Sequence, residues 1–157
     1  MEITKHFTAT TFIVNNEKVL LHLHKKLGIW LPIGGHIDRD ELPEDAAVRE
    51  AQEEAGLAVR LYNPGKKTDM VDVEQLVRPM HILLEGINQF HQHIDLIYYA
   101  TSDTDELNPQ AGETTNLKWF SPEELQTFDG APKSVKVLSM EAIKLLGSSN
   151  DKEREKK

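Results

Sequence analysis

The segment from Pro43 to Ala55 carries two different stripes of side chains, and this restricts the fold more than any other feature of the sequence. Its composition, with a proline in the first turn and Gly56 just past the end, predicts a helix. At 3.6 residues per turn, small apolar side chains gather on one face and carboxylates on roughly the opposite face. The small stripe suits close packing on a sheet, so we expect the acidic stripe to face away. The small residues are Val48, Ala51 and Ala55, and the carboxylates are Glu50, Glu53 and Glu54.

The rest of the chain alternates between strand-like and helix-like segments. Residues 7–14 are rich in β-branched and aromatic side chains, and with Lys18–His24 they predict an opening hairpin. Pro79 indicates that one later strand is an edge strand or is bulged. A capping-box pattern from Ser121 to Glu124 predicts the start of a helix. Further strands are expected at residues 58–62, 75–85, 91–101 and 116–120, a long polar loop at 63–74, and a last helix at 132–146.

This order of elements predicts an α/β fold with a mixed sheet sandwiched between helices. An α+β arrangement with helices on one face only remains an alternative, because periodicity does not separate the two. A chain of 157 residues has the size of one domain. We therefore expect a single domain over residues 1–147 and a solvated, charged C-terminal tail over residues 148–157.

Composition excludes several classes of function. The sequence has no cysteine, so disulfides, thiolate metal sites and cysteine nucleophiles are excluded, and metal chemistry falls to carboxylates and imidazoles. No apolar run is long enough to span a bilayer, and no secretory signal is evident at Met1, so we expect a cytoplasmic protein. A formal charge of −8 argues against a nucleic-acid polymer or an anionic membrane as partner. An anionic substrate would need a cation as intermediary.

The three glutamates suit such a cation. Like charges at this spacing destabilise an isolated helix by about 0.2–0.5 kcal/mol per pair, and oxygen-only ligands are typical of Mg²⁺ or Mn²⁺. An acidic stripe on its own is more often a solvated face. The surrounding stretch favours the metal. It carries Gly35, Glu41, Arg49-Glu50, Glu53-Glu54 and Gly56, followed by the apolar Leu57, at set spacing, with Ala51 a small residue at an apolar position. With these residues it resembles the Nudix box at every fixed position.

The resemblance implies an α/β/α sandwich and a Nudix-type hydrolase, which cleaves a diphosphate linkage in a nucleotide-like small molecule using Mg²⁺ and an activated water. It implies that Glu50, Glu53 and Glu54 are metal ligands. It also implies that Glu50 can serve as the base and that the backbone carbonyl of Gly34 completes the metal site.

The resemblance gives the other box residues supporting roles. Arg49 is expected to orient Glu53, and Glu41 to brace the loop. Gly35 and Gly56 are expected to supply backbone freedom, at the loop entering the helix and at the end of the helix respectively. Glu113, six residues before Trp119, stands where many family members carry a further glutamate. It is a candidate for a second metal or for the base, and a solvated loop residue is the alternative.

Weaker signals each have an ordinary explanation. His91, His93 and Asp95 share one strand face, as do His22 and His24, and a polar strand face lining a cleft is the favoured interpretation over a second metal site. Some basic side chains are candidates to contact substrate phosphates, and ordinary surface charge is the favoured interpretation for them. For two aromatic side chains, stacking on a base and a role in the core both stay open. The phosphate candidates are Lys25, Lys26 and Arg78, and the aromatic ones are Trp30 and Phe90.

The sequence leaves the substrate open between a nucleoside triphosphate and a nucleoside diphosphate derivative. Asp72 to Gln75 occupy the region where family subgroups for ADP-ribose or dinucleoside polyphosphates carry a marker proline or tyrosine. A nucleotide-binding sensor without turnover is the rival hypothesis. An isoprenoid diphosphate isomerase would need a catalytic cysteine, which is absent. The oligomeric state, including a homodimer, stays open.

Overall fold

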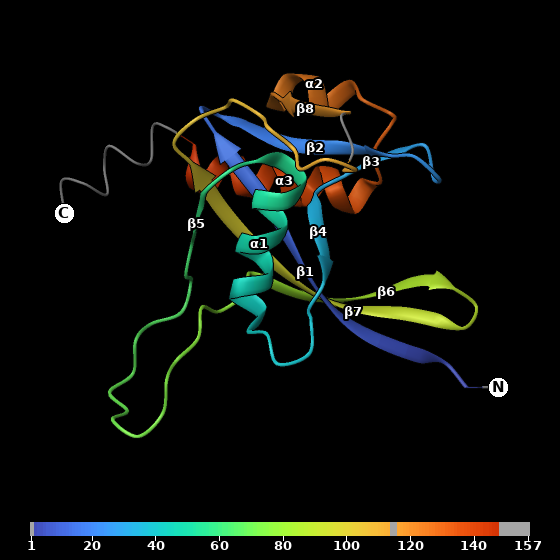
Figure 1. Ribbon diagram of the computed structural model, residues 1–157. Coiled ribbons are helices and arrows are strands. Elements are labelled where there is room, and N and C mark those ends of the chain that lie inside the picture. Colours follow the sequence, from blue (N-terminus) through green and yellow to red (C-terminus); the bar gives the residue numbers. More distant parts are fainter. Residues whose placement is uncertain (1, 114–115, 148–157) are drawn as a thin grey trace.

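The sheet is organised around β1 (Thr4–Asn15), which pairs with three other strands. Along one edge it runs parallel to β7 (His91–Ser102). Along the other edge it pairs antiparallel with β4 (Ile33–His36) in its middle and with β2 (Lys18–His24) at its end. The computed structural model, which describes residues 2–113 and 116–147, thus contains the mixed sheet that the sequence predicts (Figure 1).

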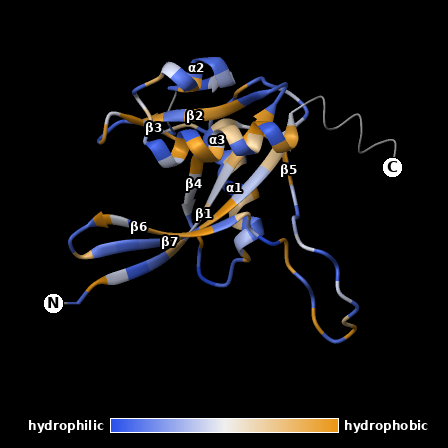
Figure 2. Ribbon diagram, turned by 180° about the vertical axis from the view of Figure 1, so that it is seen from behind, coloured by the Kyte–Doolittle hydropathy of each residue, from blue (hydrophilic) through white to orange (hydrophobic). Residues whose placement is uncertain are grey.

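Four further strands widen this sheet to eight strands among the described residues. β3 (Ile29–Leu31) and β8 (Leu117–Phe120) pair with β2. β5 (Val59–Leu61) and β6 (His81–Asn88) both pair with β7. The ladder between β6 and β7 is irregular at residues 86–88. The start of β1, the start of β7 and β6 run side by side as an arm that extends beyond the helices (Figures 1 and 2).

Helices cover both faces of the sheet. α1 (Pro43–Ala55) packs on one face, against residues such as Ala9 and Ile33. α3 (Lys133–Leu146) packs on the other face, with the short α2 (Pro122–Thr127) next to it (Figure 2). The predicted sandwich with helices on two faces is therefore confirmed, and the arrangement with helices on one face is excluded. None of the helices within the described ranges is both long and apolar enough to cross a membrane.

Local signals explain the helix ends. Gly56 ends α1 in the left-handed conformation, with φ of 69°, and its N–H donates to the carbonyl of Gln52. Leu42 precedes the helix without a side-chain cap, as its residue type predicts. Ser121 and Glu124 form both hydrogen bonds of the capping box that starts α2.

The strand predicted at residues 75–85 is wrong in its first half. β6 begins only at His81, and residues 62–80 form an extended loop without strands (Figure 1). The reason is that β5 already occupies this edge of β7, with Leu61 opposite Ala100 and the N–H of Tyr62 donating to Tyr99. Pro79, which lacks an N–H, lies in the loop just before β6.

The face that α1 buries also differs from the prediction. Val48 is 40% exposed, whereas Ala46 and Ala47 are fully buried together with Ala51 and Ala55. The alanines allow a close approach to the sheet. Glu54 of the acidic stripe is buried on this helix as well, at 8% exposed. The predicted tail at residues 148–157 lies outside the described residues.

Candidate active site

Glu50 projects from α1 onto the backbone of β4. Its side chain is 13% exposed, and its carboxylate lies so close to Gly35 that a Cβ at that position would collide with it. The predicted reason for this glycine, backbone freedom, is wrong, because Gly35 is not among the residues with positive φ. The space needed by the carboxylate requires glycine here.

Glu54 is the most deeply buried carboxylate of the cluster, at 8% exposed. Among the described residues, its Oε2 has no hydrogen-bond partner. Burial, followed by the hydrogen bond and the charge of Glu50, raises the pKa of Glu54 to about 9, while a backbone hydrogen bond from Gly34 acts in the opposite direction. A carboxyl group in this position favours a bound proton or a nearby cation.

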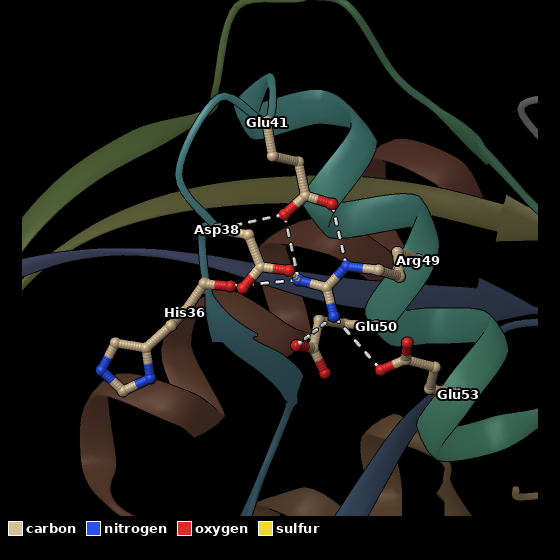
Figure 3. Close-up of polar contacts among 6 residues, drawn as sticks. All are labelled: His36, Asp38, Glu41, Arg49, Glu50 and Glu53. Carbon is tan, nitrogen blue, oxygen red and sulfur yellow. Dashed lines mark hydrogen bonds and ion pairs between the residues drawn. The ribbon is translucent and has the colours of Figure 1, made fainter.

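Arg49 ties the loop before α1 to the helix (Figure 3). Its Nε and Nη2 bind both carboxylate oxygens of Glu41, at 2.8 and 3.0 Å. Its Nη1 binds Oε1 of Glu50 at 3.0 Å and Oε2 of Glu53 at 3.2 Å, and Nη2 also donates to the carbonyl of His36 at 3.1 Å. The guanidinium therefore holds one oxygen of each of two glutamates in place.

Glu41 contacts Arg49 and the backbone rather than the other glutamates. Its hydrogen bonds with Arg49 lower the pKa of its carboxyl group, and it also accepts a bond from the N–H of Asp38 at 3.0 Å. The same bonds raise the pKa of the Arg49 guanidinium further above its ordinary value. This geometry matches a bracing contact between the loop and the helix.

The loop after β7 brings Glu113 to the same end of α1. Two carbonyls in the last turn of α1 have no partner within the helix and accept hydrogen bonds from this loop. The N–H of Asn108 donates to the carbonyl of Ala55, and the N–H of Gln110 donates to the carbonyl of Glu53, each at 2.8 Å. Glu113 is exposed, and its charge contributes to raising the pKa of Glu54. A glutamate 59 positions from Glu54 in sequence thus lies within its electrostatic reach.

The donor set fits a divalent cation that prefers oxygen ligands. The carboxyl group of Glu54, whose Oε2 has no partner among the described residues, interacts with Glu50. Arg49 contacts only one oxygen of Glu50 and one of Glu53, so their second oxygens are free of Arg49. The backbone of Gly34 hydrogen-bonds to Glu54 and lowers the pKa of its carboxyl group, as a donated N–H bond to a carboxylate does. The role of its carbonyl stays a prediction.

The weaker candidates lie elsewhere. Trp30 packs in the core against Phe120 and Phe128, with ring centroids 5.4 and 6.4 Å apart. Arg78 lines a cavity formed by the loop after β5, together with residues such as Asn63 and Lys66. The remaining weaker candidates lie in three other places. Lys25 and Lys26 are in the turn between β2 and β3, His22 and His24 are on β2, and Phe90, 41% exposed, is in the turn between β6 and β7.

The histidines of β7 have neighbours that the sequence pattern does not reveal. His91 meets His6 of β1 and His36 of β4, and the ligating nitrogens of these three residues all lie within 4.8 Å of one another. Asp95, expected beside them on the strand, is instead held by the hydroxyls of Thr8 and Thr10 at 2.8–2.9 Å. Only the pairing of three strands creates this group.

The chain is similar to known proteins over most of its length. The family model described as the NUDIX domain matches residues 4–140. A Bacillus subtilis (strain 168) protein named "Putative 8-oxo-dGTP diphosphatase" is 30% identical over 125 residues, covering 78% of this chain and 72% of that protein.

Solved structures agree in fold. A hydrolase of the NUDIX family from Clostridium perfringens superimposes with a TM-score of 0.81 at 43% identity, covering 91% of this chain and 99% of that one. The MutT protein from Methanosarcina mazei Go1 superimposes with a TM-score of 0.69 at 15% identity, covering 92% and 96%, and supports the fold alone. With the complete box from Gly35 to Leu57 and a matching domain model over residues 4–140, this chain belongs to the Nudix hydrolase family.

Proposed function

We propose that the protein uses Mg²⁺ and an activated water to hydrolyse a diphosphate linkage in a nucleoside triphosphate or a nucleoside diphosphate derivative. Mn²⁺ would be an alternative metal. The observation that carries this proposal is the buried carboxyl group of Glu54, whose Oε2 has no partner among the described residues and which lies beside Glu50. A cluster of this kind gains more from a cation than a solvated acidic face would.

Glu50, Glu53 and Glu54 would hold the metal, together with the carbonyl of Gly34. Mg²⁺ bound there would offset the charge of the substrate phosphates and polarise the phosphorus that water attacks. Arg49 fixes one oxygen each of Glu50 and Glu53, which keeps these side chains in place without help from the substrate.

Two glutamates are candidates for the base that takes the proton of the attacking water. Glu50 is rigid, because Arg49 and the backbone of Gly35 confine its carboxylate. Glu113 is exposed on a loop that is attached to the C-terminal end of α1. The restricted position of Glu50 favours it as the base, since a general base must be oriented toward one proton.

A nucleotide panel tests the proposal. Each nucleotide is incubated with the protein and Mg²⁺, and release of phosphate or diphosphate is measured. The name of the Bacillus subtilis relative supports including an oxidised guanine deoxynucleoside triphosphate beside ordinary nucleoside triphosphates and nucleoside diphosphate sugars. We expect turnover of at least one of these compounds that stops when the metal is chelated.

The rival function is a nucleotide sensor that binds without turnover. It gains support if nucleotides bind in the presence of Mg²⁺ but none is hydrolysed with any divalent metal. The complete set of glutamates favours the enzyme, because a sensor would have no need for an oriented base.

Assembly and location are also proposals. Ile82 and Leu84 of the edge strand β6 are 65% and 62% exposed, which supports a homodimer formed through this strand. Measuring the mass in solution by light scattering tests it, and a monomeric mass at all concentrations would refute it. The substrate class is consistent with a cytoplasmic enzyme that needs no nucleic-acid or membrane partner.

A further inference from the structure

A group of histidines lies on the arm of the sheet, away from the glutamates. His6 Nδ1 and His91 Nε2 are 3.1 Å apart and share a hydrogen bond. The ring of His36 lies 5.4 Å from that of His6 and 6.4 Å from that of His91, centroid to centroid. His93 adjoins the group, with its ring 5.0 Å from that of His36. Four of the seven histidines in the sequence therefore gather at one place.

The pairing of the strands accounts for this gathering. In the parallel ladder of β1 and β7, Thr4 lies opposite His91 and His6 opposite His93. In the antiparallel ladder of β1 and β4, Thr8 lies opposite His36. Side chains opposite one another, or two positions along a strand, point to the same face. The backbone of three hydrogen-bonded strands thus aims these imidazoles in one direction.

This face is the one turned away from α1. Gly35, the neighbour of His36 on β4, faces Glu50 of α1. His36 therefore directs its side chain to the opposite side, since successive residues of a strand alternate. His6 and His36 are exposed and His91 is half-buried, so the group is open to a solute. The histidines and the glutamates are two separate sets of ligands.

The chemistry of imidazole identifies the ligand. Neutral imidazole nitrogens bind Zn²⁺, Ni²⁺, Co²⁺ and Cu²⁺ well, whereas Mg²⁺ prefers oxygen. Nitrogens around a tetrahedral Zn²⁺ lie about 3.3 Å apart, as bonds of 2.0–2.1 Å require. In the structure the three nitrogens are all within 4.8 Å of one another, so small side-chain rotations would bring them onto one ion.

We propose that His6, His36 and His91 form a binding site for a divalent transition-metal ion such as Zn²⁺, separate from the carboxylate site for Mg²⁺. Three protein ligands leave a coordination position for water or another small ligand. His93 stands next to the site and is not required as a ligand. The site needs all three strands and forms only in the folded protein.

The test is a Zn²⁺ titration of the full chain by calorimetry, with Mg²⁺ in large excess to occupy the carboxylates. We expect one Zn²⁺ per chain. The double variant His6→Gln/His91→Gln should bind Zn²⁺ at least about tenfold more weakly. A matched control, His24→Gln/His81→Gln, also removes two histidines and should keep the affinity of the parent.

A second pair of variants separates the two sites. Glu53→Gln/Glu54→Gln should keep Zn²⁺ binding, because the histidines are intact. Co²⁺ should give this variant the visible absorption of a tetrahedral site, and His6→Gln/His91→Gln should lack it. If the double histidine variant does not fold, the single variant His6→Gln, at an exposed position, takes its place. The proposal is overturned if the parent binds no Zn²⁺ or if the double histidine variant binds Zn²⁺ as tightly as the parent. It is also overturned if Glu53→Gln/Glu54→Gln no longer binds Zn²⁺.

Discussion

The two sides of β4 carry opposite kinds of metal-binding chemistry. On the side of α1, Gly35 gives room to the carboxylate of Glu50, and Arg49 braces the acidic cluster. On the other side, His36 joins His6 and His91 in a group without carboxylates. The carbonyl of His36 accepts a bond from Arg49, so one residue touches both regions (Figure 3). Because successive residues of a strand point to opposite faces, the neighbours Gly35 and His36 face the oxygen ligands of α1 and the nitrogen ligands of the arm respectively.

If the acidic side is the catalytic one, Glu50→Gln should produce the largest effect. Loss of the base should lower turnover about 10²–10⁴-fold, and loss of a charged ligand can only add to this. Steady-state hydrolysis of the best substrate in the panel measures it. Asp45→Asn, an exposed carboxylate on the same helix, is the control and should keep the activity of the parent. If Glu50→Gln and the parent have equal turnover, Glu50 is not the base and the acidic side of β4 is not the catalytic one.

Glu54→Gln tests whether the acidic side binds Mg²⁺. The parent should gain about 2.7 kcal/mol of stability at a Mg²⁺ concentration a hundredfold above its dissociation constant. The variant should be no less stable than the parent in chelator, because it replaces a buried, poorly partnered carboxyl group. It should lose most of the Mg²⁺-induced rise in melting temperature, and it should lose hydrolysis. A full Mg²⁺ response in the variant would contradict the ligand assignment.

Arg49→Lys tests the brace between the two sides. Lysine keeps the charge but cannot bind Glu41 through two nitrogens while also reaching Glu50. We expect the free energy of unfolding to fall by about 1–3 kcal/mol in chelator, measured with denaturant. Turnover should also fall, because the glutamates lose their orientation. Unchanged values for both would show that Arg49 is a surface residue without a bracing role.

Glu113→Gln asks whether the loop glutamate belongs to the acidic side. Its charge acts on Glu54, so its loss should lower turnover by about tenfold and leave the melting temperature in chelator unchanged. Glu106→Gln, on the same exposed loop, is the matched control. If Glu113→Gln has the same turnover as Glu106→Gln, Glu113 does not take part in catalysis.

The smallest expected effect concerns the acids near the histidine side. Partial burial of its carboxyl group, then the hydrogen bond and charge of Asp95, raise the pKa of Glu85 to about 8. The residue as a whole is exposed, so solvent screens these interactions and their effect on stability is small. The folded protein then holds a proton that the unfolded chain releases above about pH 4.5, so this contribution to stability is full below that pH and is lost as pH rises toward 8. The melting temperature of the parent should fall between pH 5 and 8, and in Glu85→Gln this fall should be smaller by about one degree. That difference corresponds to a change on the order of a few tenths of a kcal/mol in the free energy of unfolding. An unchanged slope would contradict the raised pKa.

The sequence by itself determined the features that depend on neighbours along the chain. The span Pro43–Ala55, the left-handed end at Gly56 and the capping box at Ser121 all follow from residues three or four positions apart, which helix geometry brings together. The mixed sheet between helices also follows from the order of elements. The spacing of the glutamates within α1 placed them on one side for the same reason.

The tertiary structure decided what depends on strand register. His6 and His91 are 85 positions apart and meet only because β1 and β7 pair in parallel with a particular alignment. No local pattern encodes that alignment, since a shift by one residue would turn every side chain to the other face. The burial of Glu54, the space for Glu50 over Gly35 and the late start of β6 have the same origin, because each depends on which strand or helix already occupies the neighbouring position.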